Sequence, residues 1–298
     1  MYHPNLTSPK ELIILLKKHN FNCKKHLGQN FLVDCNILDI IIRALEPQHD
    51  DRILEIGTGI GTLSAYLSPH VNKIITIEKD RKLIPLIEEN LSAFHNIEII
   101  FEDAMDYDLS GFIKEKNKTT GMSLKIVGNL PYYISIPLIR RVLELGNLIK
   151  TAVFLVQKEV GNRLMAIPGE KDYGILSIAA QYYSKPQKIH IVPATVFYPK
   201  PKVDSMIIKL KILEKPSVKV NNEKLFFEIV RASFQQRRKR LINALCNYAH
   251  VKFNKEAVQN ALKELGIDDK LRGENLSPEK FGLLSNAIGE KMNYSPIH

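Results

Sequence analysis

The chain has 298 residues, 45% of them hydrophobic, and a formal net charge of +10. This length suits one large domain or two modest ones, and the basic charge favours a polyanionic partner. No apolar run approaches the roughly 18 residues of a membrane span, no signal-peptide pattern opens the chain, and the separated cysteines and histidines match no disulfide or metal-ligand spacing. We therefore expect a cytoplasmic protein with no metal and no membrane attachment.

The first predicted element is a short helix in an N-terminal extension, residues 1–23. Ser8-Pro9-Lys10-Glu11 is a capping box with proline at the first helical position, and the apolar run Leu12–Leu16 follows it. We expect this helix to end near His19 and to pack loosely on the main domain.

A polar and basic stretch, residues 24–32, comes next and precedes a predicted helix at 35–45 with Asp34 as its N-cap. Taken alone, this stretch has two interpretations. It is either a plain loop before a helix or a basic segment that reaches over a cofactor.

From Arg52 onward, short apolar strands alternate with helices. Strands are expected at 52–56, 73–78, 97–101, 124–128 and 152–156, and helices at 62–67, 85–93 and 137–145. This alternation predicts a parallel sheet covered on both faces. A polar, Lys-rich insertion interrupts the pattern at 114–121. Two later strands, 188–192 and 206–213, are expected to form an antiparallel pair at one edge.

The character of the chain changes after Lys215. Four segments with helical spacing follow, at 225–236, 241–249, 255–265 and 278–288, and no strand pattern remains. We therefore predict a cofactor-binding α/β domain at 24–215 and a small all-helical C-terminal domain at 216–298.

A glycine-rich turn, Glu55-Ile56-Gly57-Thr58-Gly59-Ile60-Gly61, joins the first strand of the sheet to its helix. Its spacing is G-x-G-x-G, whereas dinucleotide sites use G-x-G-x-x-G. Glu78 and Asp103 follow the next two strands, where carboxylates can accept from ribose hydroxyls and an adenine amine. A single acidic residue at a strand end is usually a solvated side chain, but the ordered set favours a ligand with a nucleoside and an amino acid and without a pyrophosphate.

A second turn, Gly128-Asn129-Leu130-Pro131-Tyr132, ends the fourth strand. Pro131 removes a backbone donor and keeps Leu130 out of the helical region, which makes the turn rigid. It offers the Asn129 amide, the Leu130 carbonyl and the Tyr132 ring, groups suited to a flat, nitrogen-bearing base. The alternative is an ordinary strand-end turn, because Asn, Pro and Gly are common turn residues.

These two turns resemble those of S-adenosylmethionine-dependent methyltransferases that act on exocyclic amines of nucleic-acid bases. Three further stretches are similar to motifs of the ribosomal RNA adenine dimethyltransferases. They are Lys25-His26-Leu27-Gly28-Gln29-Asn30-Phe31-Leu32, the loop from Val196 to Ser205, and the basic run Phe234-Gln235-Gln236-Arg237-Arg238-Lys239-Arg240-Leu241-Ile242-Asn243. The sequence from Asn129 to Ser135 is most similar to that of the small-subunit branch. The resemblance to the family covers about residues 24–287.

The resemblance implies a Rossmann-like sheet that binds S-adenosylmethionine, with no metal. It implies dimethylation of N6 of two adjacent adenosines in the 3′-terminal hairpin loop of small-subunit rRNA, coupled to small-subunit biogenesis, by a monomer that acts on the immature subunit. The implied cofactor-binding residues are Asn30, Leu32, Gly57, Gly59, Gly61, Glu78, Asp103 and Asn129. The implied catalytic set is Asn129, Leu130, Pro131, Tyr132 and Phe197, with Tyr132 and Phe197 on opposite faces of the base.

The implied RNA-binding residues are Lys24, Lys25, Lys202, Arg237, Arg238, Lys239 and Arg240, the last four on a basic helix. Taken alone, Phe197 is as consistent with loop packing, and a charge run is usually a solvated helix face. The sequence departs from the family at Thr58, where proline is common, at His26, and at Gly161-Asn162, which is expected to loosen a helix after Gln157.

Two alternatives stay open at this point. One is a large-subunit rRNA adenine methyltransferase of the antibiotic-resistance type, which shares the fold, the cofactor and the basic run. The other is an RNA-binding assembly or transcription factor on a methyltransferase fold that has lost its activity. The presence of Asn129, Pro131 and Tyr132 argues against lost catalysis.

Overall fold

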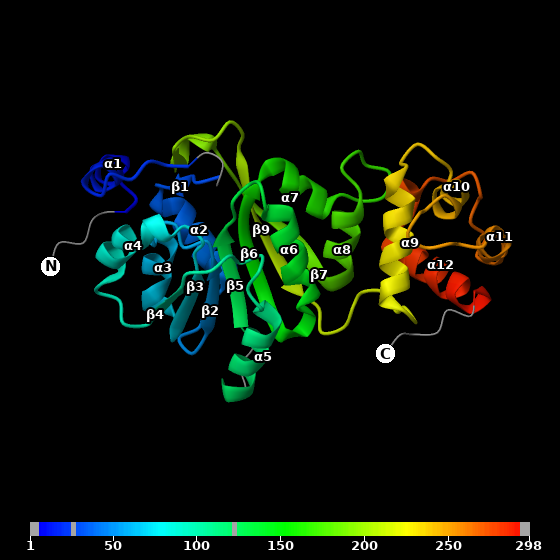
Figure 1. Ribbon diagram of the computed structural model, residues 1–298, viewed down its shortest axis with the longest axis horizontal. Coiled ribbons are helices and arrows are strands. Elements are labelled where there is room, and N and C mark those ends of the chain that lie inside the picture. The colour runs from blue at the N-terminus through cyan, green and yellow to red at the C-terminus, as the bar shows by residue number, and fades with distance from the viewer. Residues whose placement is uncertain (1–5, 25–27, 121–123, 293–298) are drawn as a thin grey trace. The chain divides into compact units, whose positions relative to one another are not determined.

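A computed structural model describes residues 6–24, 28–120 and 124–292 of the chain (Figure 1). The chain divides into two compact units, which are described separately below. The first contains residues 1–161 and 185–214, and the second contains residues 162–184 and 215–298.

The first unit is built on a seven-stranded sheet with the strand order β4-β3-β2-β5-β6-β9-β7. Its strands are β2 (Arg52–Ile56), β3 (Lys73–Ile77), β4 (Ile97–Ile100), β5 (Leu124–Asn129), β6 (Ile149–Gln157), β7 (Ser184–Val192) and β9 (Ser205–Ile212). The pairs from β4 to β6 are parallel, and β9 is antiparallel to β6. Because β3 and β5 flank β2 on opposite sides, the strand order reverses there, and open α/β sheets bind ligands at such a point.

Helices cover both faces of this sheet, as the sequence predicted. Ile53 and Leu54 are successive residues of β2, so they point to opposite faces, and both are 0% exposed. Asp34 caps its helix as expected by accepting from the backbone of Ile37. The helices of the unit are α1 (Pro9–Lys18), α2 (Cys35–Leu45), α3 (Thr62–Leu67), α4 (Ile84–Leu91), α5 (Leu109–Thr120), α6 (Ser135–Glu144) and α7 (Lys158–Met165), which runs into the second unit.

Short 3-10 turns complete this unit. They are η2 (Ser68–His70), η3 (Arg81–Leu83), η4 (Gly146–Leu148) and η5 (Ala194–Val196). A separate two-stranded sheet joins β1 (Phe31–Leu32) to β8 (Phe197–Tyr198) with Leu32 opposite Phe197. The stretch at 24–32 is therefore more than a loop, because it ends in a strand tied to a distant part of the chain.

One segment that was given no predicted structure is helical, and one local expectation was wrong. Most of the Lys-rich insertion at 114–121 belongs to helix α5, and Gly121 lies outside the described residues. Gly161 does not loosen its helix, since α7 runs through it without a break. A Cβ atom at Gly161 would come within 2.5 Å of the Met206 sulfur, so glycine allows the helix to approach β9 closely.

Among its described residues after 215, the second unit contains helices joined by turns and no strand, as predicted. Its helices are α8 (Ile175–Tyr183), α9 (Glu223–Gln235), α10 (Leu241–Cys246), α11 (Lys255–Glu264) and α12 (Pro278–Lys291), with the short turn η6 (Gly273–Asn275). Residues 162–184, which the sequence analysis placed in the α/β domain, group with these helices. The reason is aromatic packing, because Tyr182 stacks on Phe226 and Tyr183 stacks on Phe227.

Candidate active site

A cleft opens at the carboxyl ends of β2, β3 and β5 and encloses about 1020 Å³, including its open mouth. Residues from strands far apart in sequence meet there because parallel strands end at the same edge. Of the predicted site residues, those that line the cleft are Asn30, Leu32, Gly57, Gly59, Glu78, Asp103, Asn129 and Pro131. Gly61, Leu130, Tyr132 and Phe197 are not among the lining residues.

The glycine-rich turn has the backbone that its sequence predicted. Gly57, Gly59 and Gly61 have φ angles of 85°, 57° and 87°, a region that other residues rarely adopt. A Cβ atom at Gly61 would lie 2.8 Å from Leu91 of α4, and one at Gly59 would lie 3.4 Å from the Phe31 ring. The turn is therefore contacted closely by Leu91 on one side and by Phe31, a cleft-lining residue, on another.

Glu78 stands at the end of β3 with both carboxylate oxygens fixed by backbone donors. Oε2 accepts from the Gly59 amide at 2.9 Å, and Oε1 accepts from the Asp80 amide at 2.8 Å. Burial raises the pKa of Glu78 against the lowering effect of these two hydrogen bonds. The carboxylate joins the glycine-rich turn to the end of the next strand, and its remaining lone pairs are in position to accept from a ligand.

Asp103 follows β4 and lies 2.5 Å from the Lys79 ammonium. Burial alone would raise the pKa of Asp103, but the hydrogen bonds from Lys79 and from the Met105 amide outweigh it and lower that pKa. Arg141 of α6 holds the same loop by donating to the carbonyls of Ala104 and Tyr107 at 2.6 and 2.8 Å. Asp103 is thus a fixed, ionised acceptor at the rim.

The N-terminal arm, residues 20–32, crosses to this cleft, and 25–27 lie outside the described part. Lys24 Nζ and Gln29 Nε2 donate to the two oxygens of Asp80 at 2.9 and 2.8 Å. Lys24, which was predicted to bind RNA, therefore forms an ion pair with Asp80 inside the first unit. Lys25 and His26 lie outside the described residues.

The second predicted turn begins where β5 ends at Asn129. Asn129 Nδ2 donates to the Asn30 carbonyl at 3.0 Å, which leaves Oδ1 unused by that bond. The carbonyls of Pro131 and Tyr132 accept from Ile134 N and Ser135 Oγ. Among the described residues, the Leu130 carbonyl has no such donor, although its amide donates to Leu155 O at 3.1 Å. Asn129 Oδ1 and Leu130 O are thus two oxygens at one turn that no described donor occupies, although Leu130 itself is only 1% exposed.

Tyr132 and Phe197 differ sharply in exposure. Tyr132 is partly exposed, and its hydroxyl lies 2.7 Å from the hydroxyl of Ser205 at the start of β9. Burial raises the pKa of the Tyr132 phenol, so it stays neutral. Phe197 is only 3% exposed and packs in the apolar cluster that contains Leu32 and Leu38. In this structure Phe197 is a core residue and presents no free face to a base, contrary to the pairing expected with Tyr132.

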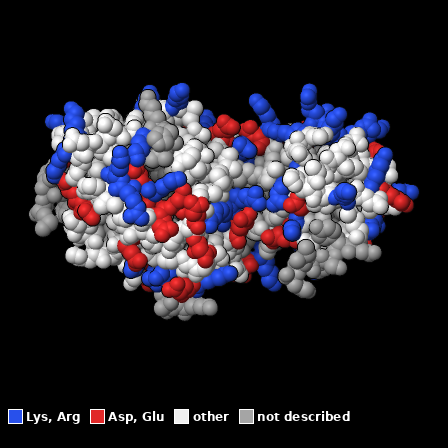
Figure 2. Space-filling view, viewed as in Figure 1, with Lys and Arg blue, Asp and Glu red and all other residues white. Residues whose placement is uncertain are grey.

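The basic run after α9 lies on a turn and not on a helix. Residues 236–240 separate α9 from α10, and the side chains at 237–240 are exposed. Arg237 nevertheless has protein partners, because its Nη2 donates to the carbonyls of Lys171 and Tyr173 at 2.9 and 3.2 Å. Figure 2 shows Lys and Arg gathered along the edge of this unit where α9 leads to α10. Lys202, in the loop between β8 and β9, is also exposed.

Several residues that line the cleft were not among the predicted site residues, and Asp80, Gln29 and Glu55 are three of them. Asp80 receives the arm, Gln29 reaches it, and Glu55 is 1% exposed beneath the glycine-rich turn. Ser64 Oγ donates to Glu55, and burial raises the pKa of this carboxyl to about 8. The sequence could have indicated Asp80 as a site residue, because it forms an acidic pair with Glu78 at the end of a strand. Nothing local in the sequence indicates that Gln29 lies near it.

The described part of the chain shows neither a membrane-spanning helix nor a cluster of metal ligands. None of its helices combines the length and apolar character that a membrane crossing requires. None of its groups of His, Cys, Asp and Glu has the arrangement to hold a metal ion.

Comparison with known proteins gives consistent results. The family model described as ribosomal RNA adenine dimethylase matches residues 20–290. Ribosomal RNA small subunit methyltransferase A from Shouchella clausii is 44% identical over 95% of this chain and 96% of its own length. The protein of the same name from Clostridioides difficile is 43% identical over 94% of this chain and 95% of its own length.

Solved structures extend the comparison to the fold. The dimethyladenosine transferase from Plasmodium falciparum has a TM-score of 0.71 at 28% identity and covers 88% of this chain and 98% of its own. The 23S rRNA methyltransferase ErmE has a TM-score of 0.65 at 24% identity, over 87% of this chain and 99% of its own. The predicted α/β methyltransferase fold is confirmed.

Proposed function

The chain belongs to the ribosomal RNA adenine dimethylase family, and we propose that it transfers methyl groups from S-adenosylmethionine to N6 of two adjacent adenosines near the 3′ end of small-subunit rRNA. The observation that carries the proposal is the meeting of two turns in one cleft. The glycine-rich turn with Glu78 and Asp103 suits a nucleoside ligand, and the Asn129–Tyr132 turn offers acceptors for an amine.

The residues of the cleft fit the proposed cofactor. Gly57 and Gly59, both with positive φ, line the cleft without side chains that would fill it, and two carboxylates stand at the ends of adjacent strands. In the proposal Glu78 accepts from the ribose hydroxyls and Asp103 from the adenine amine. Asn30, Leu32 and Asn129 complete the binding set, and Gly61 supports the turn from outside the cleft lining. When bound, S-adenosylmethionine supplies an electrophilic methyl group.

The protein's task at the other end of the cleft is to orient a weak nucleophile. The lone pair of an adenine N6 is delocalised into the ring. In the proposal, Asn129 Oδ1 and the Leu130 carbonyl accept the two N6 hydrogens, which favours a tetrahedral nitrogen with its lone pair exposed. Pro131 keeps the turn rigid, and Tyr132 stacks on the base. Rate enhancement then comes mainly from alignment.

Each chemical step conserves charge without a dedicated general base. The N6 nitrogen forms a bond to the methyl carbon as the carbon–sulfur bond breaks, and the methylated nitrogen then loses its proton to water. After one transfer a single N6 hydrogen remains to be anchored. Stacking on Tyr132 therefore becomes more important for the second transfer, and base–aromatic stacking contributes about 1–3 kcal/mol.

The proposal also covers the RNA substrate, the oligomeric state and the location of the protein. A loop substrate suits the site because unstacked bases can be presented singly to a pocket. Arg238, Lys239, Arg240 and Lys202 are exposed cations available to rRNA phosphates. We propose that the substrate is the immature small subunit, that the protein is a cytoplasmic monomer, and that methylation is coupled to subunit biogenesis.

The decisive experiment is methyl transfer to under-methylated small subunits, with the product nucleosides identified by mass spectrometry. The proposal expects N6,N6-dimethyladenosine at two adjacent positions, and loss of that product with Asn129→Ala. Large subunits serve as the competing substrate. Methylation of large-subunit rRNA alone would contradict the proposal, and so would an absence of cofactor binding by titration, as expected of an inactive methyltransferase fold.

A further inference from the structure

Helix α1 has no assigned role and lies before the residues that the family model matches, which begin at 20. Its sequence signals predicted a helix, and Ser8 caps it by accepting from the Glu11 amide. The expected packing was loose. Instead Leu12, Leu15 and Leu16 are buried at 5% exposure or less. The helix is therefore an integral part of the first unit.

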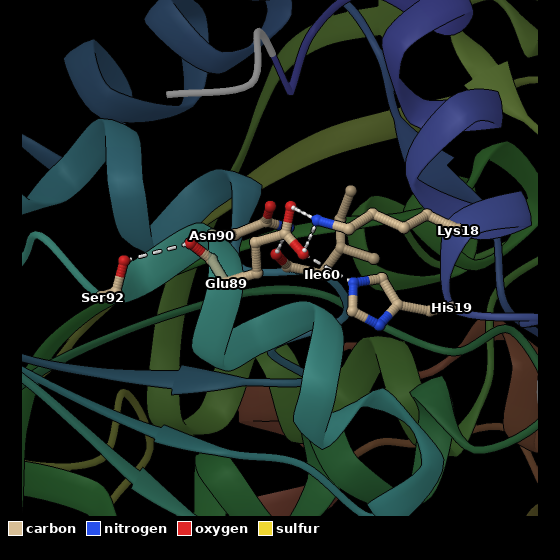
Figure 3. A network of polar contacts seen from close by, with 6 residues as sticks. All are labelled: Lys18, His19, Ile60, Glu89, Asn90 and Ser92. Atoms are coloured by element: carbon tan, nitrogen blue, oxygen red, sulfur yellow. Dashed lines mark hydrogen bonds and ion pairs between the residues drawn. The ribbon is translucent and has the colours of Figure 1, made fainter. Parts of the chain in front are cut away.

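Three ionisable groups join the end of α1 to α4. Lys18 Nζ donates to both oxygens of Glu89 at 2.8 Å, and His19 Nε2 lies 2.7 Å from Glu89 Oε2 (Figure 3). The Glu89 side chain is 32% exposed, so these are contacts at the surface of the apolar cluster beneath. The lysine and the histidine converge on one carboxylate, which fixes the point where α1 ends.

That point is where the N-terminal arm begins. Phe21 follows within two residues and is buried in the same cluster as Leu15, Phe31 and Leu86. Lys24 and Gln29 then bind Asp80, and the carbonyl of Asn30 accepts from Asn129. From the end of α1 through the described parts of the arm, the chain is thus held at three successive places, and the Glu89 contact at the end of α1 is the first.

Helix α4 also supports the glycine-rich turn from behind. Asn90, next to Glu89, donates from Nδ2 to the Ile60 carbonyl at 2.7 Å, a contact visible in Figure 3. Leu91 lies directly against Gly61. The same helix therefore holds α1 on one side and the backbone of the turn on the other.

We propose that α1, fixed through Glu89, is an anchor that positions the N-terminal arm and thereby sets the affinity of the cleft for its cofactor. Glu89 is a positioning residue, since it lines no part of the cleft and acts through α1, the arm and Asn90. The inference rests on the proposed function for the identity of the cofactor, but the anchoring itself is a property of the cofactor-free protein.

The test compares Glu89→Gln with Glu88→Gln in the full chain. Glu88 is the exposed neighbour on the same helix, so both variants remove one negative charge at nearly the same place. Because partly exposed ion pairs contribute only modestly, we expect Glu89→Gln to raise the Kd for S-adenosylmethionine about three- to fivefold. Affinity for under-methylated small subunits should not change, and Glu88→Gln should match the parent.

Hydrogen exchange of the cofactor-free proteins gives a readout independent of ligand. We expect faster exchange at residues 28–32 in Glu89→Gln and parent-like exchange in Glu88→Gln. A lower melting temperature with unchanged exchange at 28–32 and unchanged cofactor Kd would overturn the anchor, because it would show a merely local stabilising contact. If the parent itself binds no S-adenosylmethionine, the proposed function fails while the exchange result still decides the anchor.

Discussion

Asn129 Nδ2 donates a hydrogen bond to the carbonyl oxygen of Asn30 at 3.0 Å. This bond joins the end of β5 to the N-terminal arm, two segments 99 residues apart. It also orients the amide, because a nitrogen directed to Asn30 leaves the oxygen for a substrate amine. The residue proposed to hold the target base therefore also holds the arm that is proposed to contact the cofactor.

Two substitutions at this position separate the two roles. Asn129→Ala removes both the acceptor and the donor, and we expect kcat to fall about 100- to 1000-fold, as when a single transition-state hydrogen bond is deleted elsewhere. Asn129→Asp keeps an oxygen for the amine but places a carboxylate against the Asn30 carbonyl. We expect it to retain more activity than Asn129→Ala and to weaken cofactor binding more. Single-turnover methylation and cofactor titration measure the two effects. Equal cofactor affinity in both variants would contradict the second role.

Ser205 is expected to position the Tyr132 ring. Their hydroxyls lie 2.7 Å apart, and Ser205 is 0% exposed at the start of β9. Removing either hydroxyl deletes one hydrogen bond, whose net contribution is about 1 kcal/mol. We expect Ser205→Ala and Tyr132→Phe each to raise KM for the RNA substrate about fivefold at unchanged cofactor Kd. The double variant should be no worse than either single one, and additive losses would show that the two side chains act independently.

The features that the sequence predicted correctly are encoded over a few residues. The positive φ angles of Gly57, Gly59 and Gly61 follow from their spacing after a strand, and Asp34 caps its helix through a residue three positions away. Likewise the turn at Asn129–Tyr132 was predicted from Pro131, which lies within it. Such signals can be read locally because the atoms that satisfy them are neighbours in the chain.

The features that the sequence did not predict depend on distant pairing. Phe197 is buried because β8 pairs with β1, which places it opposite Leu32. Arg237 bonds to carbonyls 66 and 64 residues away. From the sequence and its family resemblance, Phe197 was expected to stack on a base and Arg237 was expected to bind phosphate. Burial, and hydrogen bonds to residues this far away in the sequence, depend on the tertiary fold. A run of four cations therefore does not indicate which of them already bonds to another part of the protein.

Arg237 is expected to behave differently from its neighbours in the basic turn. Its guanidinium holds the carbonyls of Lys171 and Tyr173, so Arg237→Ala should destabilise the second unit by about 1 kcal/mol. The side chains of Arg238 and Lys239 are exposed and have no hydrogen-bond or ion-pair partner among the described residues. Arg238→Ala with Lys239→Ala should leave stability unchanged and lower the slope of log K against log salt by about 2 for RNA binding. Chemical denaturation and binding titrations at several salt concentrations measure both. Equal effects of Arg237 and Arg238 on the salt slope would contradict the distinction.

Glu55 should make the stability of the cofactor-free protein depend on pH. Its folded-state pKa, about 8, lies above the ordinary carboxyl value because burial disfavours the charge. The folded state therefore keeps a proton that the unfolded state releases. Its contribution is fully present below the unfolded pKa, about 4.3, and is lost as the pH rises through about 8.

Glu55→Gln removes this titration while keeping an oxygen that can accept from Ser64. Between pH 5 and 8 we expect the free energy of unfolding of the variant to fall less steeply than that of the parent, by about 1 kcal/mol per pH unit. Urea denaturation at each pH unit measures the two curves, with Glu88→Gln as the control for an exposed carboxyl. Parallel curves for the parent and Glu55→Gln would mean that Glu55 is already ionised in the folded protein at neutral pH. In that case the cleft would hold two buried negative charges, Glu55 and Glu78, before any cationic ligand enters.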